Sequence, residues 1–139
     1  MRTTQVEVIV FKIVNKEPLF LLLKRNPHRG GFWQPVSGGV EEGEIALDAV
    51  KREMLEETGI SKFSKIIENV HYFEFDTEKY GKLKEYVFGV QVPAGTEPKL
   101  SYEHTEMKWC ALDAALNLLK FDSNKTAIKK LAEILKLRE

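Results

Sequence analysis

The sequence of 139 residues is poor in cysteine, carries no excess of charge of either sign and has no long apolar run. Its single cysteine, Cys110, excludes an intrachain disulfide, so we expect a protein of the reducing cytoplasm. The net charge is zero, which predicts no general attraction to nucleic acid. No apolar stretch reaches the roughly 18 residues of a membrane-spanning helix, and the N-terminus lacks a basic-then-apolar leader pattern. We therefore expect neither a nucleic acid nor a membrane as a partner.

Length and composition predict a single domain over residues 1–139. A chain of this size has room for one hydrophobic core, and 43% of its residues are hydrophobic while 30% are charged. Cys110 follows Trp109, and we expect it to be a small buried hydrophobe rather than a reactive thiol. A monomer or a homodimer is compatible with the sequence, which shows no apolar stripe beyond the needs of a core.

The hydrophobic pattern predicts strands first and helices around them. Strands are expected at residues 5–14, 19–24, near 36, 66–75, 84–92 and 106–110. The first two strands would pair as a hairpin. Helices are expected at residues 45–58, 112–119 and 124–137, the last of them capped by Asp122 or Ser123. Because these helices must cover both faces of the strands, the expected fold class is α/β, an α/β/α sandwich around a mixed β-sheet.

Residues 38–60 join a glycine-rich turn to an acidic helix. Gly38, Gly39 and Gly43 let the backbone turn tightly and approach a ligand closely. Residues 45–58 contain no proline or glycine, and Gly59 is suited to end the helix. The apolar residues that recur at helical spacing, and that we expect to face a core, are Leu47, Val50, Met54 and Leu55.

The acidic residues of this helix predict a site for divalent metal. Glu53, Glu56 and Glu57 stand at i, i+3 and i+4, so they project from one side of the helix. Without cations these carboxylates repel one another, although Arg52 can pair with Glu56 at i, i+4. The alternative interpretation is an ordinary solvated acidic face. The complete pattern argues against it, since its seven fixed positions would coincide by chance on the order of once in 10⁸ starting points.

Residues 38–60 resemble the signature of the Nudix hydrolases, G-x5-E-x7-R-E-U-x-E-E-x-G-U with U aliphatic, and every fixed position matches. The resemblance implies an enzyme that hydrolyses a nucleoside diphosphate linked to another moiety, with Mg²⁺ or Mn²⁺ as cofactor. The implied metal ligands are the carbonyl of Gly38 and the carboxylates of Glu53, Glu56 and Glu57. Glu44 and Arg52 would fix the geometry between the loop and the helix.

Segments outside the signature are similar to the dihydroneopterin triphosphate and dATP pyrophosphohydrolase branch of this family. The similar segments are residues 22–25, 32–44, 103–109 and 123–128. By this similarity Glu103 joins the metal cluster or assists the attacking water, with His104 as a loop or supporting residue beside it. The implied reaction converts a nucleoside or pterin triphosphate to the monophosphate and pyrophosphate. Either Glu56 or Glu103 would accept the proton of the water.

Five further residues are candidates for binding the substrate, namely Lys24, Arg25, Trp33, Gln34 and Asn124. Lys24 and Arg25 supply the local positive charge that a triphosphate needs, although both could be ordinary surface cations. The ring of Trp33 could lie against a base or belong to the core.

Other functions remain open. Hydrolases of diadenosine polyphosphates often carry a tyrosine 16–18 residues past the signature, where this chain has Asp76-Thr77-Glu78. ADP-ribose hydrolases tend to carry a proline at a similar distance, and none follows before Pro93. A hydrolase of oxidised nucleotides would keep the same scaffold and metal site. An isomerase of the isopentenyl diphosphate type would need a cysteine in its pocket, and a non-catalytic nucleotide-binding module usually loses a signature acid.

Overall fold

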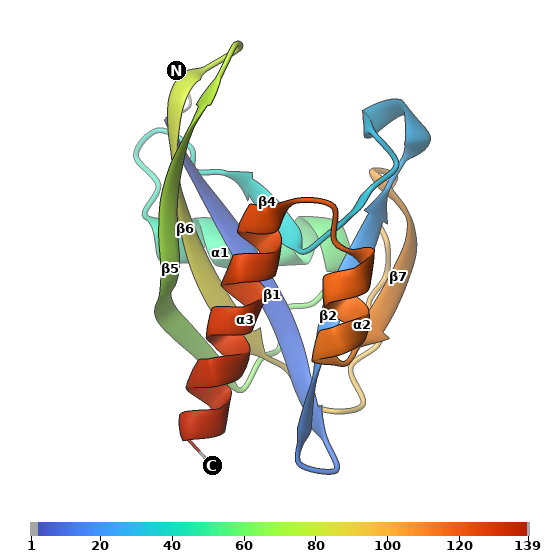
Figure 1. Ribbon diagram of the computed structural model, residues 1–139. Helices are drawn as coiled ribbons and strands as arrows, with labels where there is room; N and C mark the ends of the chain where they lie inside the picture. Colours follow the sequence, from blue (N-terminus) through green and yellow to red (C-terminus); the bar gives the residue numbers. More distant parts are fainter. Residues whose placement is uncertain (1–2, 139) are drawn as a thin grey trace.

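The computed structural model describes residues 3–138, so residues 1, 2 and 139 of the expected domain lie outside the described residues. The elements in chain order are β1 (Thr4–Val14), β2 (Glu17–Arg25), the 3-10 turn η1 (Pro27–Arg29), β3 (Trp33–Gln34), β4 (Val36–Gly39), α1 (Ala46–Thr58), β5 (Lys65–Thr77), β6 (Gly81–Gln91), β7 (His104–Cys110), α2 (Leu112–Leu118) and α3 (Asp122–Leu137). Within the described range seven strands form one sheet, with α1 on one face and α2 and α3 on the other (Figure 1).

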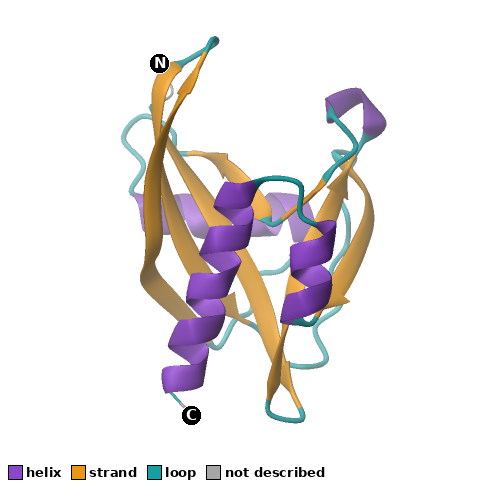
Figure 2. Cartoon of the chain, viewed as in Figure 1, coloured by secondary structure: helices purple, strands orange, loops and turns teal. Residues whose placement is uncertain are grey.

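The order of the strands is β3-β2-β1-β6-β5, with β4 beside β1 and β7 beside β2. The sheet is mixed because β1 and β6 run parallel, whereas the other pairs are antiparallel. Figure 2 shows the resulting layers, with strands between helices. The predicted α/β/α sandwich around a mixed sheet is therefore confirmed.

Strand β1 is central because its two faces supply both hydrophobic cores. Val6, Val8 and Val10 face the cluster that α1 covers, and Ile9 and Phe11 face the cluster under α2 and α3. All five side chains are fully buried. The alternation follows from the two-residue period of a strand, so each face presents every second side chain to one helical layer. The residues that the helices add to the cores include Ala49, Val50 and Met54 from α1 and Ala127, Ile128 and Leu131 from α3.

The predicted hairpin between the first two strands is present. Asn15 and Lys16 adopt positive φ angles of 52° and 69°, the conformation that a two-residue primed turn requires. Val14 then pairs with Glu17 across the turn. This register continues into the sheet and brings Phe11 opposite Phe20.

Several predicted details differ from the structure. Helix α3 begins at Asp122 after Phe121, whose side chain makes no capping hydrogen bond, so the predicted cap at Asp122 or Ser123 is wrong. Both residues lie in the first turn, where the carboxylate of Asp122 is favourably placed against the helix dipole. The β5–β6 hairpin is longer than expected, since its strands continue to Thr77 and resume at Gly81. Strand β3 was not predicted, and β7 begins two residues early, at His104.

The helix α1 buries a narrower stripe than its sequence predicts. Leu55 is 52% exposed, so the prediction that it faces the core is wrong. Val50, Met54 and Glu57 stand at i, i+4 and i+7, and this is the buried stripe. Leu55 follows Met54 by one residue and is rotated away from it by about 100°. Cys110 is 2% exposed, which confirms the prediction that it is buried.

Candidate metal centre and adjoining cleft

The acidic side of α1 lies directly over β4. Gly38 in β4 pairs with Val6 of β1, which fixes its distance from the helix. A Cβ atom at Gly38 would overlap the carboxylate group of Glu53. Only a glycine therefore allows the carboxylate of Glu53 to lie this close to the strand, with the backbone of Gly38 beneath it.

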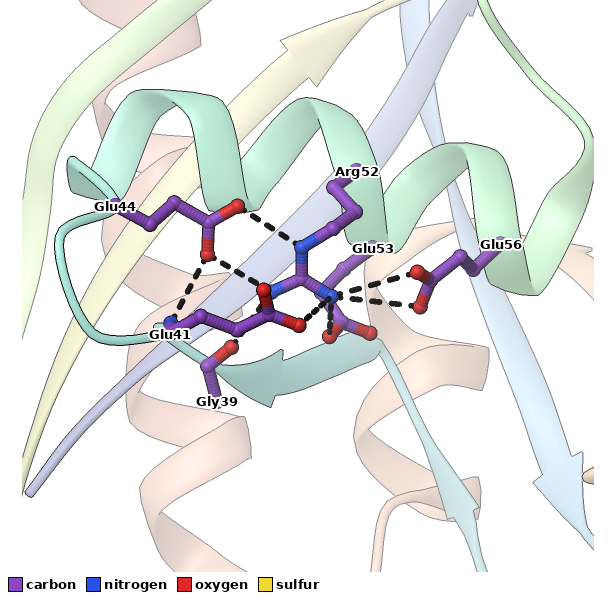
Figure 3. A network of polar contacts seen from close by, with 6 residues as sticks. All are labelled: Gly39, Glu41, Glu44, Arg52, Glu53 and Glu56. Carbon is purple, nitrogen blue, oxygen red and sulfur yellow. Dashed lines mark hydrogen bonds and ion pairs between the residues drawn. The ribbon is translucent and has the colours of Figure 1, made fainter. Parts of the chain in front are cut away.

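Arg52 connects the loop, the strand and the helix. Its Nε and Nη2 atoms donate to the two carboxylate oxygens of Glu44, both at 2.9 Å, and Nη2 also donates to the Gly39 carbonyl at 2.8 Å (Figure 3). Its Nη1 atom donates to Glu53 Oε1 at 2.8 Å and lies 3.4 Å from Glu56 Oε2. One guanidinium group thereby orients two of the three helical carboxylates, as well as the loop before the helix.

The hydrogen bonds between Arg52 and Glu44 shift the pKa of both groups so that both stay charged. The hydrogen bonds from Arg52, followed by one from the Glu41 backbone amide, lower the pKa of Glu44 to about 2. The hydrogen bond to Glu44 in turn raises the pKa of Arg52. Glu44 is thus a carboxylate and Arg52 a cation at any pH at which the fold is expected to be stable. The sequence resemblance implied a supporting role for both residues, and that role stays a prediction.

The three helical carboxylates occupy different environments. Relative exposure of the side chain is 4% for Glu57, 12% for Glu53 and 58% for Glu56. Burial, and then the neighbouring Glu53 and Glu103 carboxylates, raise the pKa of Glu57 well above its ordinary value. The Oε2 atom of Glu57 has no hydrogen-bond partner within residues 3–138. A buried carboxylate with a free oxygen is costly unless a cation or a proton compensates it.

Glu103, just before β7, and His104, its first residue, lie close to Glu57. Glu103, His104 and Glu57 each place one ligand atom within 4.8 Å of the others. His104 is 6% exposed, and its Nε2 atom lies 3.6 Å from Glu57 Oε1. Because burial lowers the pKa of His104, the ring is neutral at neutral pH. The sequence placed His104 in a loop, whereas the structure makes it the first residue of a strand.

The donor set fits a hard divalent cation. Glu57 and Glu103, with Glu53 beside Glu57, offer carboxylate oxygens, the ligands that Mg²⁺ and Mn²⁺ prefer, and Glu57 has an unpartnered oxygen for such an ion. Glu56 stands at the exposed edge of the same helix face, open to solvent. A cation would also relieve the mutual repulsion that raises the pKa of Glu57.

A cleft of about 530 Å³ adjoins this centre. The residues that line it come from the β5–β6 hairpin, from strands β1 to β4 and from the start of α3. Its lining residues are Gln5, Glu7, Arg25, Gln34, Pro35, Ser37, Phe73, Glu74, Phe75, Glu85, Phe121, Ser123 and Asn124. Arg25 of this lining also acts electrostatically on Glu57, so the cleft and the metal centre are close neighbours. This volume is typical of a small-molecule site.

The predicted substrate-binding residues fall into two groups. Arg25, Gln34 and Asn124 line the cleft. Lys24 and Trp33 do not belong to its lining in the described chain. Lys24 instead lies 3.3 Å from Glu106 of the neighbouring strand β7.

Trp33 packs against the core cluster under α2 and α3, and it forms a bridge with Leu119. Of the two interpretations of Trp33, the structure therefore places its ring with the core. Its neighbour in the sheet is Lys24 of β2.

Sequence reasoning missed two residues at the bottom of the cleft, Glu7 and Glu85. Glu7 is fully buried and Glu85 is 7% exposed. The signal that could have found Glu7 is a lone carboxylate on the face of β1 that otherwise carries Ile9 and Phe11. A strand covered by helices on both faces must bury such a residue.

Comparison with known proteins identifies the family. Residues 3–131 match the family model described as NUDIX domain. The chain therefore belongs to the NUDIX family. The match begins at residue 3, just before β1, and extends into α3, so it covers every element of the metal centre and of the cleft.

Curated relatives of similar length carry names for different substrates. The chain is 29% identical to dihydroneopterin triphosphate diphosphatase from Escherichia coli K12, an alignment that covers 93% of this chain and 91% of that protein. It is 27% identical to bis(5'-nucleosyl)-tetraphosphatase from Caenorhabditis elegans, over 92% of this chain and 93% of that protein. An octanoyltransferase from Myxococcus xanthus is 34% identical over 94% of this chain, but the chain spans only 36% of its length.

Solved structures agree in fold. A Listeria monocytogenes protein described as a NUDIX hydrolase superposes with a TM-score of 0.87 at 29% identity, covering 99% of this chain and 97% of that one. The E. coli dihydroneopterin triphosphate pyrophosphohydrolase gives a TM-score of 0.80 at 28% identity, covering 93% and 94%. The predicted family, its fold and the predicted enzyme class, a pyrophosphohydrolase acting on nucleotide-like substrates, are confirmed. In residues 3–138 no helix has both the length and the hydropathy needed to cross a membrane.

Proposed function

We propose that this chain is a Mg²⁺- or Mn²⁺-dependent hydrolase that cleaves a nucleoside or pterin triphosphate to the monophosphate and pyrophosphate. The observation that carries the proposal is a residue shared by two sites, since Arg25 lines the cleft and its charge acts on Glu57. The signature carboxylates of α1 lie over Gly38, and the neighbouring Ser37 lines a cleft of about 530 Å³. A substrate with its planar ring in this cleft would direct its phosphates toward the carboxylates.

The proposed metal ligands are the carboxylates of Glu53, Glu56, Glu57 and Glu103, and the carbonyl of Gly38. When bound, the metal supplies charge neutralisation at the phosphate oxygens and lowers the pKa of a bound water. Arg52 holds Glu53 and Glu56 in position before any ion arrives, because its Nη1 atom contacts both. The centre is thereby preorganised, and little side-chain ordering is left to the binding step.

Arg25 links the two sites. It lines the cleft, and its charge also acts on Glu57, whose pKa it lowers against the larger effects that raise it. Its Nε atom is buried and has no hydrogen-bond partner in the described part of the chain. A guanidinium group in this position is suited to bind a phosphate oxygen between the ring and the metal centre.

In the proposed reaction, water attacks the α-phosphorus and the bond to the bridging oxygen breaks. The bridging oxygen leaves with pyrophosphate, and the proton of the water passes to a carboxylate. Glu56 and Glu103 are the two candidates for this base. Glu57 is not a candidate, because it is deeply buried and its task is to hold the cation.

The relatives support a triphosphate but also name the main competitor. The E. coli relative is a dihydroneopterin triphosphate diphosphatase, and the C. elegans relative is a tetraphosphatase that acts on a bis(5'-nucleosyl) compound. The chain has Asp76-Thr77-Glu78 where the sequence resemblance would expect a tyrosine in hydrolases of the second kind. We therefore favour the triphosphate.

Product analysis tests the proposal. The purified chain is incubated with dNTPs, NTPs, dihydroneopterin triphosphate, oxidised dGTP, ADP-ribose and diadenosine tetraphosphate, with Mg²⁺ and with a chelator. Metal-dependent release of pyrophosphate and a monophosphate from one triphosphate class is expected. Preferential cleavage of the dinucleotide would overturn the substrate class. Absence of turnover with every compound would favour a non-catalytic binding module.

A further inference from the structure

Glu7 is a buried carboxylate at the bottom of the cleft. It lies in β1 between the neighbouring strands β4 and β6, and its side chain is fully buried. It is on the same face of β1 as Ile9 and Phe11. Its Oε1 atom accepts a hydrogen bond from the Asn124 side-chain amide of α3. Its Oε2 atom has no partner among residues 3–138. A buried polar atom without a partner needs an explanation, because leaving it so is unfavourable.

Glu85 places a second carboxylate beside Glu7. In the parallel register of β1 and β6, Gln5 is opposite Glu85, and Glu7 follows Gln5 by two residues on the same face. Burial, and then the charge of Glu85, raise the pKa of Glu7 well above its ordinary value. Burial raises the pKa of Glu85 to about 7. The two carboxylates thus lie next to each other in a setting that disfavours their charge.

The rest of the cleft is suited to a flat ring. Phe73 and Phe75 come from β5, and Phe121 comes from the residue before α3. Aromatic side chains around a narrow cleft favour planar heterocycles through stacking and apolar contact. Arg25 stands toward the metal centre, so the phosphates would leave the cleft in that direction. Glu7 lies opposite Ser37 in the register of β1 and β4, and both line the cleft together with Glu85, so one edge of a bound ring would meet Glu7 and Glu85.

We propose that Glu7, Glu85 and Asn124 select a heterocycle that presents a ring N–H beside an exocyclic amino group, the edge that guanine and pterins share. This inference rests on the proposed function, since it names the substrate class of the same cleft. Two neighbouring N–H donors would satisfy the free oxygen of Glu7 and the carboxylate of Glu85.

Other rings fit these acceptors less well. Adenine offers one amino group beside a ring nitrogen that is itself an acceptor. Uracil and thymine place a single N–H between two carbonyl oxygens, which would face the carboxylates. Hypoxanthine keeps the ring N–H of guanine and lacks only its amino group. Comparison of guanine with hypoxanthine therefore isolates one of the two donors.

The test compares steady-state hydrolysis of GTP, dihydroneopterin triphosphate, ITP and ATP in Mg²⁺. For the wild type we expect kcat/KM for GTP, for the pterin, or for both, to exceed that for ITP and ATP by about tenfold or more. If only GTP or only dihydroneopterin triphosphate is preferred, the result shows whether the ring is a guanine or a pterin. Equal values for GTP, the pterin, ITP and ATP, or a preference for ATP, would overturn the inference.

Two variants test whether Glu7 and Glu85 cause this preference. In Glu7→Gln and Glu85→Gln the loss of one carboxylate oxygen should raise KM for the favoured substrate by about tenfold. ITP keeps the ring N–H, so the variant that changes the partner of this N–H should raise KM for ITP as well, whereas the other variant should change it by less than about threefold. The matched control is Glu68→Gln, which removes an exposed carboxylate of β5 outside the cleft and should leave the ratio unchanged. A preference that persists in both cleft variants would refute the assignment. If a variant fails to fold, as judged by its melting curve, the wild-type series still decides.

A binding measurement separates this inference from the proposed function. Calorimetry with GMP and IMP in chelator requires no metal and no turnover. Tighter binding of GMP by about fivefold or more, together with no hydrolysis of any triphosphate, would support the cleft assignment and reject the proposed reaction. Hydrolysis of triphosphates with equal binding of GMP and IMP, and equal turnover of the pterin and ATP, would retain the reaction and reject the cleft assignment.

Discussion

Arg52 donates to both carboxylate oxygens of Glu44, from Nε to Oε2 and from Nη2 to Oε1, each at 2.9 Å. The two residues are eight positions apart, and between them the chain passes from a loop into α1. The same guanidinium group reaches the Gly39 carbonyl and Glu53. A planar fork with five N–H donors can make these contacts together, and a lysine cannot.

We therefore expect Arg52→Lys to impair both stability and turnover. Lysine keeps the charge but makes only one of the two contacts to Glu44, so the loop and the carboxylates of α1 lose their common support. The expected fall in melting temperature is about 5 °C. The expected loss in kcat is about tenfold or more, because Glu53 and Glu56 are no longer oriented. Thermal unfolding and Mg²⁺-dependent turnover measure the two effects.

The control for this variant is Arg29→Lys. Arg29 lies in the exposed turn η1, so the same exchange there removes no contact of the metal centre. We expect its melting temperature and turnover to equal those of the wild type within error. Equal behaviour of Arg52→Lys and Arg29→Lys would show that charge alone, and not the fork, supports the centre.

We expect the buried Glu57 to be required for turnover. Without metal, its disfavoured charge should lower the stability of the fold. Glu57→Gln removes a carboxylate whose charge is disfavoured by burial and by Glu53. In chelator we expect this variant to melt no lower than the wild type. In Mg²⁺ its turnover should fall by roughly a hundredfold or more.

The exposed Glu56 gives a matched comparison. Glu56→Gln should lower turnover by roughly a hundredfold, with little change in melting temperature, since the side chain is 58% exposed. Glu42→Gln in the exposed loop of the signature serves as the control and should be active. Near-wild-type turnover in Glu56→Gln or Glu57→Gln would contradict the proposed metal centre.

The metal centre could be predicted from sequence because its parts are local. Gly38, Glu44 and the carboxylates of α1 lie within 23 consecutive residues, and helical spacing alone places Glu53 and Glu57 together. The hydrophobic period likewise predicted β1, α1 and the layers that cover them. What the spacing could not supply was the difference in burial between Glu56 and Glu57. That difference depends on which side of α1 rests on the sheet.

Three lining residues of the cleft, Arg25, Gln34 and Asn124, were candidates from the sequence, but its shape and its two buried carboxylates could not be predicted because distant segments form it. Glu7, Glu85 and Asn124 come from β1, β6 and α3, and the parallel pairing of β1 with β6 brings the first two together. Parallel pairing over such a distance leaves no mark in local periodicity. The N-terminal cap of α3 failed for a related reason, since Phe121 lines the cleft at the position where a capping side chain would stand.

Gly38 should tolerate no side chain. In Gly38→Ala the new Cβ would overlap the Glu53 carboxylate, so Glu53 or the strand must move. We expect turnover in Mg²⁺ to fall by about tenfold or more, because a displacement near 1 Å at a catalytic centre has effects of this order. The control is Gly95→Ala, where a Cβ would meet no atom within 4 Å. Equal turnover of the two variants would show that Gly38 is not constrained by Glu53.

The pKa of Glu85 predicts how stability depends on pH. Burial raises this pKa from an ordinary 4.5 to about 7, so between these values the folded state retains a proton that the unfolded state releases. The contribution of the neutral carboxyl is complete below about pH 4.5 and is lost as the pH rises through about 7. A difference of this size corresponds to about 3 kcal/mol in the free energy of unfolding.

Urea unfolding in chelator at pH 5 and pH 8 measures this contribution, with metal removed so that ion binding adds no pH dependence of its own. In the wild type the free energy of unfolding should decrease between these two pH values. In Glu85→Gln the decrease should be smaller, by an amount on the order of the 3 kcal/mol that the pKa implies, because glutamine does not titrate. Glu68→Gln, which changes an exposed carboxylate, should retain the wild-type slope. An unchanged slope in Glu85→Gln would show that folding does not raise the pKa of Glu85.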